Sequence, residues 1–150
     1  MAFSDDSGGF AFACEDAKIS ICASTWSTRL SQLGLVQGPV FVMTGALPGH
    51  DYISRIIGKR PQNIFIIANS NAELEAKALK LKFPTVRIVL HKNNNAKVVL
   101  VSPATVWVSS SDFGETRQIQ SAVGIHSASV YNRTLDTLFR RVWDEGTEVS

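Results

Sequence analysis

Residues 85–113 contain three short apolar runs separated by polar clusters, and this pattern constrains the fold more than any other stretch of the chain. The runs are rich in Val, Ile and Leu, and they span residues 85–90, 97–101 and 105–108. Such a composition is typical of strands that are buried on both faces, so the stretch predicts a β-sheet. Polar clusters follow two of the runs, at His91–Asn95 and Ser109–Asp112. We expect both clusters at strand ends, where ligands bind in α/β sheets.

The remaining apolar segments alternate between strand and helix patterns. Further strands are predicted over 17–23, 40–44, 63–68 and 119–125, and helices over 52–59, 72–82 and 127–143. Asp51 is the predicted cap of the first helix. In the helix over 72–82, Leu74, Ala78 and Leu81 recur at helical spacing and are expected to face the core. This order predicts an α/β fold, a single layered domain with a mixed β-sheet flanked by helices.

The length of 150 residues fits one domain, which we expect over residues 17–150 after a mobile N-terminal lead over residues 1–16. No apolar run approaches the ~18 residues of a membrane span, and the N-terminus lacks the pattern of a signal peptide. These features predict a cytoplasmic protein without a membrane partner. Cys14 and Cys22 are too far apart for a Cys-x-x-Cys pair. Metal-ligand spacing and a glycine-rich phosphate loop are also missing from the sequence, so we expect no metal and no cofactor.

The sequence from Asn95 to Phe113 resembles the signature of the phospholipase D superfamily and its nucleases. That signature reads His-x-Lys-x-x-x-x-Asp, then a strand, then Gly-Ser-x-Asn-Phe. Lys97 matches the family lysine, Ser110 the serine, and Phe113 the residue after the asparagine. More loosely, the order of strands and helices from residue 18 to residue 143 is similar to that of the short, single-motif nucleases of the family. The resemblance implies a phospholipase D-like domain.

Several functional positions of this signature are changed. Asn95 stands where the family has its nucleophilic histidine, and Ser102 stands where it has aspartate. Ser109 replaces a glycine, Asp112 replaces the asparagine, and Ala122 occupies the place of a family glutamate. The resemblance therefore implies a frame that is kept and a chemistry that is largely lost.

The family chemistry explains why the change at Asn95 matters most. The resemblance implies two histidine motifs that face each other, within one chain or across a two-fold dimer, so a homodimer is expected. One imidazole attacks phosphorus and the other protonates the leaving oxygen, two roles that suit a group titrating near neutral pH. The amide of Asn95 neither attacks phosphorus nor titrates. We expect hydrolysis by this route to be lost, which favours a protein that is not an enzyme.

Phosphate binding is the property that can persist without the nucleophile. Lys97, Asn95, Ser110 and Ser111 all offer hydrogen-bond donors, and the net charge of +2 permits an anionic partner. Asp112 brings a negative charge that opposes an anion. The structural alternative is that Lys97 keeps its ammonium group in water at a strand end and that the serines are turn residues. Both interpretations stay open.

Three functions follow from these residues. The first is binding of nucleic acid, or of another phosphate-bearing ligand, without cleavage. The second is a protein-interaction or inhibitor module that uses the fold as a scaffold. The third is an active phosphodiesterase or endonuclease that uses a displaced His91 or a histidine of a partner chain. Spacing alone does not support His91, because a lone histidine at a strand end is more often a surface or hydrogen-bonded residue.

Overall fold

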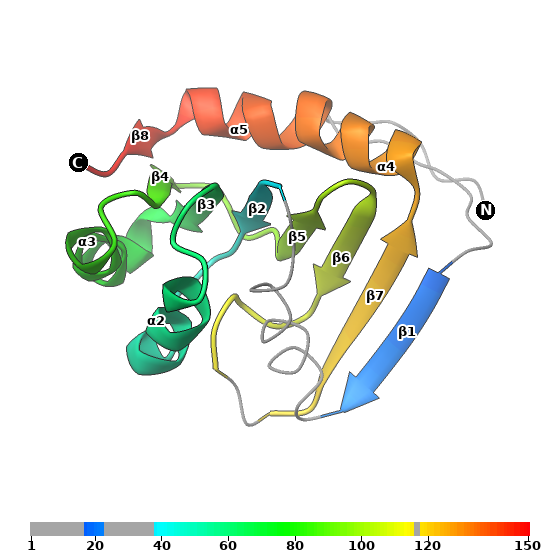
Figure 1. Cartoon of the computed structure of the whole chain (residues 1–150), viewed down its shortest axis with the longest axis horizontal. Coiled ribbons are helices and arrows are strands. Elements are labelled where there is room, and N and C mark those ends of the chain that lie inside the picture. Colours follow the sequence, from blue (N-terminus) through cyan, green and yellow to red (C-terminus); the bar gives the residue numbers. More distant parts are fainter. Residues whose placement is uncertain (1–16, 23–37, 116–117) are drawn as a thin grey trace.

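A computed structural model describes residues 17–22, 38–115 and 118–150, so the predicted lead over residues 1–16 lies outside the described residues. The described strands form one mixed sheet with the order β1-β7-β6-β5-β2-β3-β4-β8 (Figure 1). Their bounds are β1 Ala17–Cys22, β2 Val40–Met43, β3 Ile64–Asn69, β4 Arg87–His91, β5 Val98–Val101, β6 Thr105–Ser109, β7 Gln120–His126 and β8 Thr147–Glu148. The predicted α/β fold with a mixed sheet is confirmed.

The strand directions bring the two polar clusters to the same edge of the sheet. β2, β3 and β4 are parallel, whereas β5 runs antiparallel to β2, and β6 runs antiparallel to β5. The carboxyl ends of β2, β3, β4 and β6 therefore lie at the edge where β5 begins. The loop between β4 and β5 and the loop after β6 both belong to this edge, so the two polar clusters lie at strand ends, as expected, and on the same side.

Helices cover both faces of the sheet (Figure 1). On one face α2 (His50–Gly58), a 3-10 turn (Ser70–Ala72) and α3 (Glu73–Lys82) pack against strand residues such as Val42, Ile66 and Ile88. The C-terminal helical segment covers the other face and consists of α4 (Ala128–Arg133), a π-helical turn (Thr134–Phe139) and α5 (Arg140–Glu145). Of the helices that the structure describes, none is both long and apolar enough to cross a bilayer.

Two helix predictions are corrected by the structure, and the first concerns which face of α3 is buried. The buried side chains of the helix are Ala76 and Leu79, whereas Leu74 and Leu81 are 81% and 85% exposed. Both sets of residues recur at helical spacing, so periodicity alone does not choose between them. The small side chain of Ala76 allows the helix to lie close to the sheet.

The second correction concerns the start of α2. The helix begins at His50 after the N-cap Gly49, and Asp51 lies inside the first turn and is not the cap. Gly49 has a φ of 76°, a left-handed conformation that favours glycine. The carbonyl of Pro48 accepts the Glu115 N–H at 3.0 Å, and a Cβ on Gly49 would lie 2.7 Å from the Glu115 Cβ. Close approach to the segment after β6 therefore determines how this helix begins.

Candidate functional site

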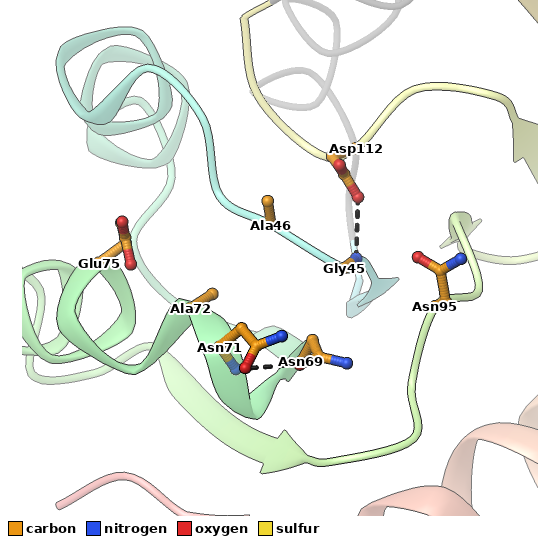
Figure 2. Close-up of a pocket in the computed structure, with 8 residues that line it drawn as sticks. All are labelled: Gly45, Ala46, Asn69, Asn71, Ala72, Glu75, Asn95 and Asp112. Atoms are coloured by element: carbon orange, nitrogen blue, oxygen red, sulfur yellow. Dashed lines mark hydrogen bonds between the residues drawn. The ribbon is translucent and has the colours of Figure 1, made fainter.

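A cavity of about 300 Å³ opens at the sheet edge where the polar clusters meet (Figure 2). Its walls come from the segment after β2, the end of β3 and the start of α3. The loop before β5 and the loop after β6 complete them. The lining residues are Gly45, Ala46, Asn69, Asn71, Ala72, Glu75, Asn95 and Asp112. They supply amides, carboxylates and backbone groups, and there is no imidazole among them.

The carboxylate of Asp112 takes the hydrogen-bond donors at one side of this cavity. Its Oδ1 accepts the Gly45 N–H at 2.9 Å (Figure 2). The same oxygen lies 3.2 Å from the hydroxyl oxygen of Thr44. The Nζ of Lys97 lies 3.9 Å from the same carboxylate oxygen. The Thr44 hydroxyl also accepts the Phe113 N–H at 2.9 Å, which fixes the loop that carries Asp112. The carboxylate of Asp112 thus lies beside Lys97, the only lysine among the residues predicted to bind phosphate.

Buried hydrogen bonds hold the loop between β4 and β5 in place. Asn94 is 5% exposed, and its Nδ2 donates to the Thr44 carbonyl at 2.8 Å. The side chain of Asn69, at the end of β3, donates to the Asn94 carbonyl at 2.9 Å. The Asn69 oxygen also accepts the Asn71 N–H at 2.9 Å and so caps the 3-10 turn Ser70–Ala72. These contacts present Asn95 to the cavity, and sequence reasoning missed the part played by Asn94.

Asn95, Lys97 and Asp112, three positions of the sequence resemblance, lie near one another at this edge of the sheet. Asn95 is exposed and lines the cavity, and the side chain of Lys97 is 23% exposed. A Cβ added to Gly45 would lie 3.0 Å from the Asp112 Oδ1 and 3.1 Å from the Asn95 Oδ1. The absence of a side chain at Gly45 is therefore what lets both side-chain oxygens approach the strand end.

The serines after β6 contribute to the loop and do not line the cavity. The Ser110 hydroxyl donates to the side-chain oxygen of Gln120. Ser111 is 4% exposed, and its hydroxyl donates to the Asp112 carbonyl at 3.1 Å. Ser109 accepts the Ser111 N–H at 2.9 Å. The hydroxyl protons of Ser110 and Ser111 are thus committed to protein acceptors.

Two other positions of the resemblance lie away from the cavity. Ser102 is at the opposite end of β5, where its hydroxyl donates to the Pro39 carbonyl at 2.7 Å and lies 3.0 Å from the Tyr131 hydroxyl oxygen. It therefore joins the far edge of the sheet to α4. Ala122 is buried in β7 opposite Ser109, so no carboxylate is present at that place.

His91 lines a different cavity, of about 390 Å³, beside α5 and β8. Its Nε2 lies 3.2 Å from the Glu145 carboxylate, and its Nδ1 accepts the Asn93 N–H at 3.1 Å. Both ring nitrogens thus have protein partners. The structure does not bring His91 together with Asn95.

Away from this site, an ion pair joins the neighbouring strands β4 and β8. The Arg87 guanidinium contacts both oxygens of Glu148, at 2.8 and 3.0 Å. These hydrogen bonds raise the pKa of Arg87 and lower the pKa of Glu148. Within residues 17–22, 38–115 and 118–150, no three His, Cys, Asp or Glu side chains gather as a metal site.

The sheet, its two helical layers and the cavity at the strand ends define an α/β domain whose site lies where the parallel strands finish. No family model matches the sequence, and no curated protein matches it either. Solved structures identify the fold as phospholipase D-like. The phospholipase D family member Nuc from Salmonella typhimurium is 15% identical with a TM-score of 0.73, over 89% of this chain and 99% of that chain.

Two further structures have the same architecture. NucT from Helicobacter pylori is 12% identical with a TM-score of 0.71, over 89% of this chain and 100% of that chain. TrmBL2, an archaeal chromatin protein whose structure shows a mode of DNA binding, is 14% identical with a TM-score of 0.65. That match covers 90% of this chain and 54% of TrmBL2. The resemblance in the sequence signature and the likeness in three dimensions therefore agree on the fold.

Proposed function

We propose that this domain binds nucleic acid through its phosphates and does not cleave it. The observation that carries the proposal is the amide of Asn95 at the cavity, next to Lys97 and Asp112. The resemblance gives that position to the nucleophilic histidine, and an amide can neither attack phosphorus nor transfer the proton. His91, the displaced candidate, uses both ring nitrogens in another cavity.

The binding half of the proposal rests on the groups that remain at this edge. Lys97 keeps a partly exposed ammonium group, Lys92 is exposed in the neighbouring loop, and Asn95 offers amide donors. Contacts of this kind hold a phosphate backbone without reading its sequence. The fold shared with an archaeal chromatin protein supports nucleic acid as the phosphate-bearing ligand.

Asp112 sets the expected strength of that binding. Its carboxylate lies close to Lys97 and offsets part of the positive charge that a phosphate would meet. We therefore expect weak, non-specific binding that falls steeply as salt rises, because the remaining attraction depends on displaced counterions.

Fluorescence anisotropy tests the proposal with labelled single- and double-stranded DNA and RNA at several salt concentrations, and each end-point sample is run on a denaturing gel. We expect salt-sensitive binding, an intact probe, and a loss of affinity in Lys97→Ala. Lys59→Ala is the matched control, because it removes the same charge from an exposed position just after α2. Failure to bind at low salt would refute the proposal, as would equal effects of the two variants. A cleaved probe would refute its non-catalytic half.

A protein-binding scaffold is the second candidate, and the exposed leucines of α3 favour it. Leu74 and Leu81 are 81% and 85% exposed on a helix whose opposite face is buried. Apolar contacts predict an affinity with little salt dependence, in contrast to phosphate contacts. The same salt series therefore separates the two functions once a partner is available.

A further inference from the structure

The outer face of α3 carries an apolar stripe that the domain itself does not cover. Leu74, Ala78 and Leu81 follow one another at intervals of four and three residues, and all of them are exposed. The buried residues of the same helix, Ala76 and Leu79, already pack on the domain core. A helix with apolar stripes on two opposite faces has one stripe more than its own core requires.

The charges of α3 are divided along its length. Glu73 and Glu75 lie in the first turn, whereas Lys80 and Lys82 lie in the last turn. A second α3 running in the opposite direction would place acidic residues beside basic ones at both ends. A parallel arrangement would instead place like charges together, which is destabilising.

We propose that this face is a self-association surface, on which a second copy of the chain docks its own α3 antiparallel across a two-fold axis. Leu74 of each copy then packs against Leu81 of the other, and the small Ala78 lies at the crossing and permits close approach. Glu75 of one copy lies beside Lys82 of the other. The partner surface is thus the same face of α3 in a second copy. Because that helix runs in the opposite direction, its basic end lies beside the acidic end of the first.

A groove next to the stripe provides room for this contact. It has a volume of about 470 Å³ and lies beside Leu81, bounded by Lys77, Lys80 and Pro84. In the antiparallel arrangement this is where Leu74 of the second copy arrives. The two-fold axis passes beside α3, so the pairing differs from the dimer with facing motifs that the resemblance implies. It also places the second copy beside Glu75, a residue that lines the cavity at the strand ends.

Sedimentation velocity of the full chain tests the proposal. A contact formed mainly by one helix face buries less than the ~1,200 Å² of a standard interface, so we expect dimers that form between about 10 µM and 1 mM. The variant with Leu74→Gln and Leu81→Gln removes four buried leucines per dimer and should weaken association by at least about 100-fold. Ile119→Gln is the control, because Ile119 is 78% exposed and lies outside α3. A wild-type chain that stays monomeric would overturn the proposal, as would a dimer that survives the two substitutions.

Charge reversal tests the direction of the helices. Glu75→Lys or Lys82→Glu alone should weaken the dimer by about 2- to 30-fold, because each change sets like charges side by side twice in the dimer. The variant that carries both changes should recover wild-type association, since the pair is restored in reverse. Absence of recovery would overturn the antiparallel arrangement. Circular dichroism of each variant is the control for retention of the fold.

Discussion

Replacement of Asp112 by asparagine is expected to strengthen phosphate binding, because it removes a negative charge and keeps the shape of the side chain. The amide oxygen introduced by Asp112→Asn can still accept the Gly45 N–H, which the carboxylate now binds at 2.9 Å. The loop should therefore keep its position. The substitution also brings the position back to the residue type that the resemblance implies for an active relative.

The size of the effect follows from the geometry of the pair. The Asp112 oxygen lies 3.9 Å from the Lys97 Nζ, so a phosphate bound to that lysine would meet the carboxylate at a similar distance. Two unit charges 4 Å apart interact by about 4 kcal/mol at an effective dielectric constant near 20. The two side chains are 23% and 27% exposed, and solvent screening reduces the expected gain to about 1–2 kcal/mol. This free energy corresponds to about 5- to 30-fold tighter binding at low salt.

Anisotropy of a labelled single-stranded oligonucleotide at about 50 mM salt measures this change. Asp136→Asn is the matched control, because it alters the net charge equally on the helical segment that covers the opposite face of the sheet. We expect the control to change affinity by less than about twofold. Equal gains in the two variants would mean that only net charge matters. No gain from Asp112→Asn would show that phosphate does not approach Lys97.

Three further substitutions test other parts of the structure. His91→Ala should lower the free energy of unfolding in urea by about 1 kcal/mol, through loss of its hydrogen bonds, and leave nucleic-acid affinity unchanged; a loss of affinity would connect this ring to the site. Gly124→Ala should cost about 1–3 kcal/mol, since its Cβ would lie 2.5 Å from the Trp107 ring; unchanged urea unfolding would contradict this packing. Arg87 lowers the pKa of Glu148, so their pair stabilises the fold at pH 7 and is lost as pH falls through that lowered pKa. Glu148→Gln should therefore cost about 0.5 kcal/mol at pH 7, and this cost should shrink as the pH falls through the lowered pKa of Glu148, as measured by urea unfolding over an acidic pH series.

The sheet could be predicted from the sequence because its strands are short runs of Val, Ile and Leu, although only β5 of the three is buried along most of its length and Val108 of β6 is 46% exposed. The runs at 85–90, 97–101 and 105–108 correspond to β4, β5 and β6, with boundaries that differ by no more than two residues. Near-continuous Val, Ile and Leu identify such strands directly. Once the strands are placed, their directions bring Asn95 and Asp112 to one edge. The sequence places both residues at strand ends, and the strand directions, which it does not give, bring them together.

Contacts between residues far apart in the chain could not be predicted in the same way. The Gly45 N–H that binds Asp112 belongs to a residue 67 positions earlier, and the carbonyl that binds Asn94 is 50 positions earlier. Local composition gives no sign of either bond. The choice between the two apolar stripes of α3 also depended on tertiary packing, because Leu74 and Ala76 both fit a helical period.

The departures at Asn95 and Asp112 are easier to understand together than separately. A site that binds phosphate in an enzyme keeps its cation available for the substrate, and an unpaired cation in a partly buried place lowers stability until the ligand arrives. Here Asp112 supplies the counter-charge to Lys97 within the chain, at 3.9 Å, so this lysine is paired without a ligand. Asn95 adds no charge that would disturb this balance. Restoring a histidine at Asn95 alone would therefore leave Lys97 engaged with Asp112, and on our proposal a return to catalysis requires both positions to change.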